Sequence, residues 1–484
     1  MKKNELYEVV SNIEEGFVDH ALETEEKNIR KADAKTKAPK RRLPLWGDVA
    51  AAVLVAATVI TVSIAVTNRS GNKAGMTNDG GSTIEKPTQG EIITEHSLTN
   101  LMEGIKAKPA PSIRKISKAE AETVADFAVK LLKNAKKNGE NSLVSPISVI
   151  AALSMTANGA KGNTLSQMES TLGMSLEDLN SFFKAYVRSL AQDDKNKFSL
   201  ADSIWFKSGC VDFNTGFLQA NADFYGADAY EASFDEKTLA DINKWVNDNT
   251  NGMIPKILDK VPDGAVMYLI NALAFEAEWI VPYNEEQVFP SKFTLENGQK
   301  KDVTLMTSNE RFYLETANAT GFIKHYANHK YAFAALLPNE GVTVNELVSS
   351  LDGKTLSGIL TNAEQTSVRA VIPKFEAEFG TDLADSLKAM GMTDAFDSSL
   401  ADFSGIGTWK LDGFTRIGRV IHKTYISVTE QGTKAGAATA VEMTNDSIPI
   451  NNKEVILNRP FVYMLIDLEN NIPFFIGTLE DVAG

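Results

Sequence analysis

Asn141-Ser-Leu-Val-Ser-Pro-Ile-Ser-Val-Ile150 is the stretch of sequence on which the interpretation of the fold depends, and it leads on to Gly159-Ala-Lys-Gly-Asn-Thr164. Just before it, residues 119–136 place apolar side chains at helical spacing, and Asn138-Gly139 supplies a stop signal. The sequence therefore predicts a helix that ends shortly before this stretch.

Helical and strand-like segments alternate irregularly from there to the C-terminus. Further amphipathic helices are expected at residues 242–246 and 383–390. Runs rich in apolar and β-branched side chains predict strands at residues 266–275, 331–337, 368–373, 455–457, 461–467 and 473–479. Because the segments lack the regular period of a doubly wound sheet, the sequence predicts the α+β class.

Length and composition exclude several classes of protein. The 484 residues suffice for one very large domain or for two to three ordinary ones with a sizeable core. A formal net charge of −14 argues against the clustered basic surface that nucleic-acid binding requires, so no nucleic-acid partner is expected. Cys210 is the single cysteine, which excludes an intrachain disulfide and leaves packing to hold the fold.

The N-terminal part of the chain predicts a membrane anchor. Residues 1–44 are polar and end in a basic cluster, and the uncharged apolar run 49–66 follows. About 18 residues at a rise of 1.5 Å cross the hydrocarbon core, so residues 45–67 are expected to form one transmembrane helix. The basic flank places residues 1–44 in the cytoplasm and the chain after Asn68 outside the cell.

A cleaved signal peptide is the alternative, and it would release the protein as a secreted form. The segment before the apolar run is far longer than a normal charged n-region, which favours the retained anchor. Residues 68–114 have too few apolar side chains to order the chain, and they predict a flexible extracellular tether. Whether residues 1–44 also bind a regulator stays open.

The stretch at residues 141–150 resembles the helix-opening motif of the serpin family, the serine protease inhibitors. Further blocks of the family follow in its order, and together they carry the resemblance. These blocks are Ile242-Asn-Lys-Trp-Val246, Thr250-Asn-Gly-Met-Ile254, Ile270-Asn-Ala-Leu-Ala-Phe275 with Trp279, Ile372-Pro-Lys-Phe375, Leu383-Ala-Asp-Ser-Leu387, Gly391-Met392, Ala401-Asp-Phe-Ser-Gly-Ile406, His422-Lys423, Glu430-Gln-Gly-Thr433 and Arg459-Pro-Phe461. The resemblance implies a serpin-like domain over residues 115–484, with mixed sheets, surrounding helices and an exposed reactive-centre loop at residues 430–455.

Two polar residues, Asn271 and His422, lie within strand-like apolar runs, so each needs a hydrogen-bond partner inside the fold. The resemblance to serpins assigns four residues to the shutter, the polar cluster beneath the central sheet through which an extra strand must pass. These residues are Ser145, Ser148, Asn271 and His422. A structural rather than a catalytic role is expected for them.

Motifs of enzymes are missing from the sequence. It contains no nucleophile elbow, His-Glu-x-x-His, phosphate-binding loop or dinucleotide fingerprint in a fitting context. His325 and His329 have the four-residue spacing of a metal-ligand pair but no accompanying carboxylate motif. Cys210 lies in a turn-like stretch without a thiol-enzyme motif. We therefore expect no enzyme, no cofactor and no metal site.

Glu430 opens a long connection between two strand-like regions, and the connection contains a run of small residues that an ordinary turn does not need. If the run became a strand, Thr433 and every second residue after it would face one side, where small side chains slip over a packed core. The resemblance identifies the run as the loop hinge. Its residues are Glu430, Gly432, Thr433, Ala435, Gly436, Ala437, Ala438 and Thr439.

The resemblance implies a suicide-substrate inhibitor of serine proteases. In that mechanism the protease cuts the loop and stays trapped as an acyl-enzyme while the loop inserts into the central sheet. The alternative is a non-inhibitory serpin that acts as a carrier, storage protein or chaperone. Because no bulky or proline side chain faces inward in the hinge, inhibition is favoured.

Family spacing from Glu430 places the reactive bond between Asp446 and Ser447. This bond would suit a Glu/Asp-preferring protease. The segment up to the next strand is longer than usual in the family, so a shifted register stays open. Val441 and Met443 lie nearby and would suit an elastase-like or subtilisin-like pocket instead.

Overall fold

The computed structural model describes residues 97–109, 114–190, 193–261, 266–410, 416–433 and 453–482. The predicted cytoplasmic segment, the transmembrane helix and most of the predicted tether lie outside these residues. Of the helices within the described ranges, none combines the length and the apolar character that a membrane crossing requires.

Two large sheets and a short strand pair organise the described residues. The central sheet contains, in spatial order, β1 (Leu98–Asn100), β5 (Asp228–Ala232), β3 (Asn196–Lys207), β6 (Met267–Glu278), β15 (Gly432–Thr433), β14 (Val420–Val428) and β12 (Phe375–Asp382). The second sheet contains β16 (Lys453–Ile456), β11 (Glu364–Pro373), β8 (Lys300–Glu315), β9 (Ala319–His325), β10 (Tyr331–Pro338), β17 (Phe461–Asp467), β18 (Ile472–Leu479) and β2 (Ser142–Val144), with β7 (Val288–Thr294) on β8. The short pair is β4 (Val211–Phe213) with β13 (Gly407–Trp409).

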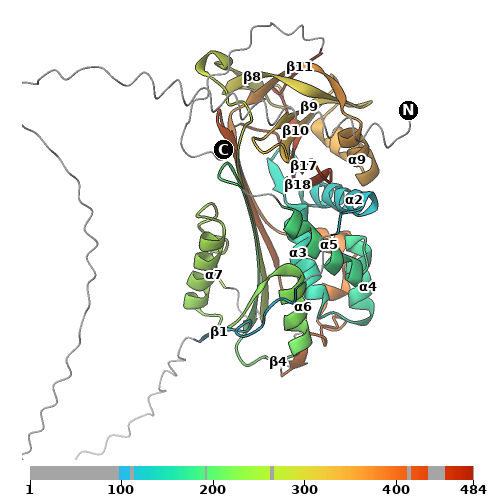
Figure 1. Cartoon of the computed structure of the whole chain (residues 1–484), viewed down its shortest axis with the longest axis vertical. Coiled ribbons are helices and arrows are strands. Elements are labelled where there is room, and N and C mark those ends of the chain that lie inside the picture. Colours follow the sequence, from blue (N-terminus) through green and yellow to red (C-terminus); the bar gives the residue numbers. More distant parts are fainter. Residues whose placement is uncertain are drawn as a thin grey trace, which may run out of the picture. The chain divides into compact units, whose positions relative to one another are not determined.

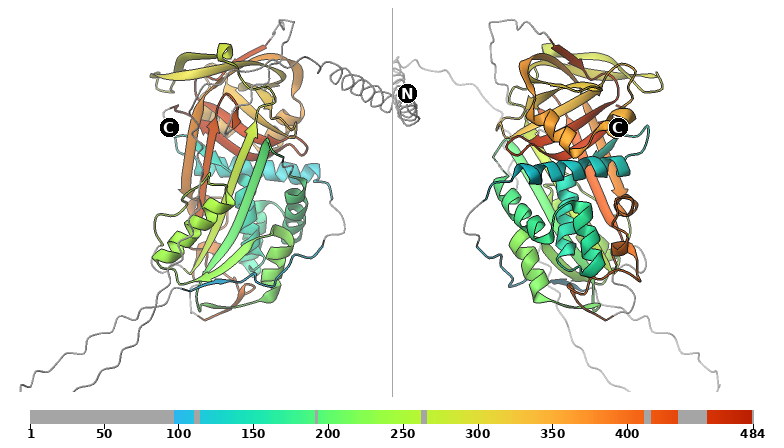
Figure 2. Two further views of the ribbon diagram at one scale, coloured as in Figure 1. Left: turned by 60° about the vertical axis from the view of Figure 1, so that its left-hand side comes forward. Right: turned by 90° about the vertical axis from the view of Figure 1, so that its right-hand side faces the viewer.

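Helices cover both faces of the central sheet. Figure 1 shows α7 on one side of its long strands and α3, α5 and α6 on the other. The right-hand view of Figure 2 shows the helices of residues 118–189 gathered over the second of these faces. The helices are α2 (Lys118–Ala135), α3 (Pro146–Ala157), α4 (Gly162–Leu172), α5 (Leu176–Ser189), α6 (Thr215–Tyr225), α7 (Glu236–Asn249), α8 (Val344–Ser350), α9 (Gly353–Thr361) and α10 (Ala384–Ala389), with 3-10 turns η1 (Glu285–Gln287) and η2 (Asp394–Phe396).

The burial of the central strand β6 shows that both faces of the sheet need a packed layer. Nearly all of its residues are buried, as expected for a strand with packed layers on both faces. Leu269 and Leu273 join the main core, whereas Tyr268 and Ile270 join a smaller apolar cluster that also contains Val246 of α7. Odd-numbered residues of β6 therefore face the main core, and even-numbered residues face the α7 side.

The stretch that opened the sequence analysis forms β2 and the start of α3. Ser145 is the N-cap of α3, and its side-chain oxygen accepts a hydrogen bond from the backbone N–H of Ser148, while Pro146 occupies the first turn. Every residue of α3 is buried, which is typical of a helix that is apolar on all sides. The N-terminus of α3 is thereby fixed beneath the central sheet.

The predicted α+β class with mixed sheets is confirmed. The predicted tether at residues 68–114 is wrong at its C-terminal end, because β1 pairs with β5 at the edge of the central sheet. The backbone N–H of Lys108 also donates to Asp223 over 2.6 Å. Composition misled here because few apolar side chains of this segment, Leu101, Met102 and Ile105, pack against the main core while backbone hydrogen bonds hold its strand.

Candidate functional site

The hinge begins inside the central sheet. β15 pairs with β14 through Thr433 and Val428 and with β6 through Thr433 and Ala277. Thr433 is 1% exposed, and its hydroxyl lies 2.5 Å from the hydroxyl of Tyr326. A Cβ atom at Gly432 would lie 2.0 Å from the carbonyl oxygen of Ala277, so only glycine allows this close approach. The first inward-facing residue of the hinge is therefore already inserted.

Backbone hydrogen bonds hold the base of the hinge to the end of β6. The backbone N–H of Trp279 donates to the carbonyl of Gln431 over 2.8 Å, and its indole N–H donates to the carbonyl of Thr429 over 2.9 Å. The backbone N–H of Tyr283 donates to the carbonyl of Glu430 over 2.9 Å. These contacts fix where the hinge enters the sheet.

The buried ammonium group of Lys324 contacts two aromatic residues, Trp279 and Tyr283, where the hinge enters the central sheet. The Lys324 ammonium is buried, lies 2.9 Å from the Glu310 carboxylate, and sits 4.5 Å from the ring centre of Tyr283 and 5.2 Å from that of Trp279. The Glu310 carboxylate and the Tyr283 ring raise the pKa of Lys324 against the opposing effect of burial. The sequence reasoning missed this cluster because its members are distant along the chain.

Below the hinge, β6 and β14 face each other in two different ways. Residues 269–271 pair in parallel with residues 420–422. Between these pairs and the hinge, at residues 272–276 of β6, no direct pairing of β6 with β14 is described. We call this whole β6–β14 boundary the seam. The hinge lies between the two strands at one end of the seam, and the strands pair directly at the other end.

The paired end of the seam contains the predicted shutter residues. His422 is 2% exposed, and its Nε2 accepts a hydrogen bond from the backbone N–H of Ser145 over 3.1 Å. Burial lowers the pKa of His422 to about 4. The neutral imidazole thus links β14 to the N-terminus of α3. Ser148 follows within the first turn of α3, and its hydroxyl is buried without a partner among the described residues.

Asn271 stands opposite His422 in the β6–β14 register. On its other side it stands opposite Asp202 of β3, and its side-chain amide N–H donates to the Asp202 carboxylate. Burial raises the pKa of Asp202 to about 7, although the Asn271 hydrogen bond opposes this shift. The sequence reasoning missed Asp202, and the available signal was a lone carboxylate before the apolar run Ile204-Trp-Phe206.

The structure therefore brings Ser145, Ser148, Asn271 and His422 together at one end of the seam, and Glu430, Gly432 and Thr433 at the other. The remaining predicted loop residues lie outside the described residues. They are Ala435, Gly436, Ala437, Ala438, Thr439, Asp446 and Ser447.

The chain returns to the fold in the other sheet. β16 pairs in parallel with β11, from Val368 opposite Lys453 to Val371 opposite Ile456. The Lys453 ammonium lies 3.3 Å from the Glu315 carboxylate and 4.4 Å from the ring centre of Tyr313. The two ends of the long connection are therefore anchored in separate sheets.

The other candidate residues form no chemical site in the described part of the chain. No group of three or more His, Cys, Asp or Glu side chains in that part is arranged to hold a metal ion. The rings of His325 and His329 are 6.2 Å apart, and burial lowers the pKa of His325. Burial also raises the pKa of the Cys210 thiol, which disfavours the nucleophilic thiolate.

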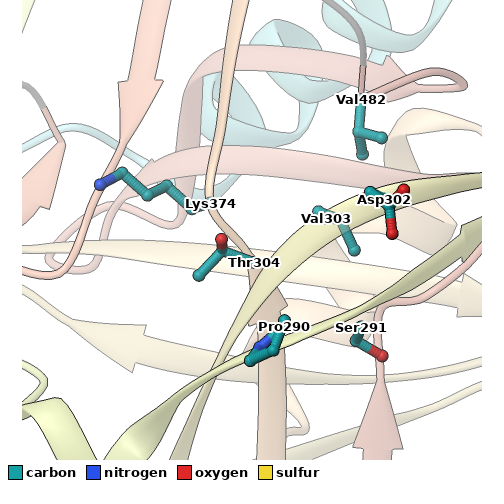
Figure 3. A pocket seen from close by; sticks show the side chains of 7 residues that line it. All are labelled: Pro290, Ser291, Asp302, Val303, Thr304, Lys374 and Val482. Atoms are coloured by element: carbon teal, nitrogen blue, oxygen red, sulfur yellow. The ribbon is translucent and has the colours of Figure 1, made fainter.

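A surface pocket lies beside the connection between β11 and β12, and Figure 3 shows its lining. Its carboxylate, Asp302, is already paired with the Lys292 ammonium at 2.5 Å. Lys374 extends away from Asp302 and Val482 (Figure 3), and its ammonium pairs with Glu430 at 3.0 Å. The two charged groups of the pocket are thus used in surface ion pairs, and one of these pairs belongs to the hinge.

Comparisons with known proteins agree with this geometry. The family described as Serpin (serine protease inhibitor) matches residues 122–482. Intracellular coagulation inhibitor 2 of Tachypleus tridentatus is 27% identical, over 74% of this chain and 90% of its own, and leukocyte elastase inhibitor of Xenopus laevis is 30% identical, over 70% and 93%. The crystal structure of tengpin, a thermophilic serpin, in the native state is 46% identical, covers 79% of this chain and 99% of its own, and has a TM-score of 0.76.

Proposed function

Because this chain belongs to the serpin family, we propose that it inhibits serine proteases by inserting its cleaved loop into the central sheet. Serpins are protease inhibitors and generally not enzymes themselves. Inhibitors of coagulation and of leukocyte elastase are among the relatives of this chain. The finer statement, that this chain traps its target by loop insertion, rests on the state of the seam.

One observation carries the proposal: the hinge strand β15 already lies within the seam. Thr433 pairs with Ala277 of β6 on one side and with Val428 of β14 on the other, whereas residues 269–271 and 420–422 of the same two strands still pair directly with each other. Backbone N–H and C=O groups inside a protein require hydrogen-bond partners. A strand that continued from Thr433 would provide them on both sides. The seam thus favours entry of the residues that follow the hinge.

The proposed reaction starts as an ordinary proteolysis. The serine of the protease attacks the carbonyl carbon of the reactive bond, the new amino terminus leaves, and an acyl-enzyme forms. The freed segment after Thr433 then enters the seam, separates residues 269–271 from residues 420–422, and carries the bound protease with it. About 14 residues at roughly 3.3 Å each move the protease by tens of ångströms.

Trapping depends on which step is faster. Hydrolysis of the acyl-enzyme requires an intact oxyanion hole and an aligned triad in the protease. If insertion is faster than hydrolysis, the displaced protease is pressed against the inhibitor, and the distorted site no longer releases the acyl group. If hydrolysis is faster, the loop is only a substrate. The small inward-facing residues of the hinge serve to keep insertion fast.

Specificity follows from the reactive bond, which we place between Asp446 and Ser447. An acidic residue at this bond favours a Glu/Asp-preferring protease. With a shifted register, Val441 or Met443 would offer an apolar side chain to an elastase-like or subtilisin-like enzyme. The mass of the released C-terminal fragment identifies the bond.

We also propose that residues 45–67 anchor the protein in the cell membrane, with the serpin domain outside. The support is the uncharged apolar run behind a basic cluster. Fractionation of expressing cells should place the intact chain in the membrane, and protease added outside should degrade the domain while residues 1–44 stay protected. A chain that is found only in the medium and lacks the apolar run would instead indicate cleavage and secretion.

The test of inhibition uses the purified extracellular part with a panel of serine proteases. The target protease should form a complex that survives SDS, together with a small C-terminal fragment, and the cleaved protein should melt at a higher temperature than the intact one. Complete cleavage without a complex for every protease, and an unchanged melting temperature, would contradict the proposal.

A further inference from the structure

Three polar side chains form one row across the central sheet. Asp202 on β3, Asn271 on β6 and His422 on β14 stand opposite one another in the strand registers. All three are buried, with Asp202 at 6% exposure. Residues in register on neighbouring strands point to the same face, and His422 contacts Ser145, so the row faces the main core. The seam runs between the second and third members of the row.

One polar atom of this row has no hydrogen-bond partner if Asp202 is ionised. The Asn271 amide N–H donates to the Asp202 carboxyl group, but the Asn271 side-chain oxygen is buried and has no partner among the described residues. An ionised carboxylate only accepts hydrogen bonds, so it cannot satisfy this oxygen. A protonated carboxyl group has one O–H donor, and it pairs with an amide by giving one hydrogen bond and accepting another.

We propose that Asp202 is a proton-controlled latch beside the seam: in the closed sheet its protonated carboxyl group pairs with both polar atoms of the Asn271 amide, the residue that borders the seam opposite His422, and loss of the proton promotes opening. The proton is released to solvent when the seam opens. This role deepens the proposed function, because an opening of the seam is the step that loop insertion requires.

The surroundings of Asp202 offer no compensating cation. The titratable group that interacts with it is Tyr225 of α6, whose pKa is raised by burial, and His422, whose pKa is lowered to about 4 by burial, stands one strand further along the row. Both groups are neutral between pH 5 and pH 9. Among the described residues, Asp202 has a hydrogen bond with Asn271 and no ion pair with a lysine or an arginine. An Asp202 carboxylate would therefore be a buried charge with a single amide donor.

Opening of the seam gives that charge access to water or to the polar backbone of an entering strand. The closed sheet binds the proton more tightly than the open sheet, so opening becomes easier as the pH rises. With a pKa of about 7 in the closed sheet and an ordinary value of about 4 in the open sheet, the opening equilibrium should increase about tenfold between about pH 6 and about pH 8.

Hydrogen exchange of the backbone N–H of Ile421 measures this opening without any protease, because the Val420 carbonyl bonds Leu383 on the β12 side and the N–H of the next residue therefore faces β6. After correction for the intrinsic exchange rate, the intact extracellular part should show the tenfold increase. Asp202→Asn keeps the shape but cannot ionise, so its opening equilibrium should change less than about twofold over this range. Asp467→Asn is the matched control, because burial also raises the pKa of Asp467, which lies on β17 of the second sheet. It should retain the full dependence.

An equal pH dependence in Asp202→Asn and in the wild type would overturn the latch. Infrared titration of the wild type and of Asp467→Asn adds a readout that needs no change at Asp202. A protonated carboxyl band should disappear with a midpoint near pH 7 in both proteins, and its absence at about pH 6 would also overturn the latch. Neither measurement requires inhibition, so a failed latch and a failed inhibitory function are distinguished.

Discussion

The two ends of the seam differ in how they resist an entering strand. At the hinge end, Thr433 already separates β6 from β14 and its hydroxyl contacts that of Tyr326, while Trp279 binds the backbone of Gln431 two residues earlier in the chain. At the shutter end the two strands pair directly, and His422 ties β14 to α3. Under the proposed function, the barrier to insertion therefore lies mainly at the shutter end, where three register pairs must separate.

The largest expected effect comes from blocking entry at the hinge end. Thr433→Arg places a long charged side chain where a hydroxyl is buried, and the cost of burying an unpaired charge slows insertion. The stable complex should fall more than about tenfold, and cleaved inhibitor should accumulate instead. Gel analysis with the target protease measures both products. Thr433→Ser, which keeps the hydroxyl, should retain the complex, and an unaffected Thr433→Arg would show that entry does not pass Thr433.

Removal of the hydrogen bond between His422 and Ser145 at the shutter end should have the next largest effect. His422→Ala leaves a cavity and an unpaired Ser145 N–H, which together should lower the free energy of unfolding by about 4 kcal/mol. Denaturant unfolding of the intact protein measures this loss. His422→Gln can still accept the hydrogen bond and should lose much less. If the two variants lost the same amount, the hydrogen bond to Ser145 would not be the important contact.

Acid should weaken the same end without any mutation. The pKa of His422 is about 4 in the fold because of burial and about 6.5 in the unfolded chain, so the unfolded chain binds the extra proton first. The stabilising contribution is complete above about pH 6.5 and is lost as the pH falls toward 4, by about 3 kcal/mol. Unfolding measured across this range should show this slope in the wild type, and the slope should be reduced in His422→Gln. Equal slopes would assign the acid sensitivity to other groups.

The smallest expected effect concerns the surface of the hinge end. The Lys374–Glu430 ion pair is partly exposed, so Lys374→Met should change the free energy of unfolding by only about 0.5 kcal/mol, and less at high salt. Denaturant unfolding at two salt concentrations measures it. A loss of several kcal/mol would mean that this pair closes the hinge end more firmly than its exposure indicates.

Local patterns predicted much of this architecture. The apolar runs at residues 461–467 and 473–479 predicted β17 and β18 closely, since buried strands are continuous in sequence. Asn271 and His422 were found because a polar residue in an apolar strand needs a partner. The partners themselves could not be read from the chain, because the register that brings Asp202 to Asn271 joins residues 69 positions apart. The Lys324–Glu310 pair, 14 positions apart on the adjacent strands β8 and β9, likewise depends on a register that the sequence does not state. Residues 97–109 were missed because three apolar side chains and backbone pairing leave no clear pattern.

Under the proposed function, the anchoring of the connection in two sheets explains why proteolysis would be the trigger of insertion. While the chain is uncut, residues that follow Thr433 cannot travel far into the seam unless β16 detaches from β11, which breaks the parallel ladder and the contacts of Lys453. A cut anywhere between Thr433 and Lys453 separates these two events. In the proposed mechanism, the pairing of β16 with β11 is therefore the constraint that prevents insertion, and the protease that cleaves the connection removes this constraint by its own catalysis.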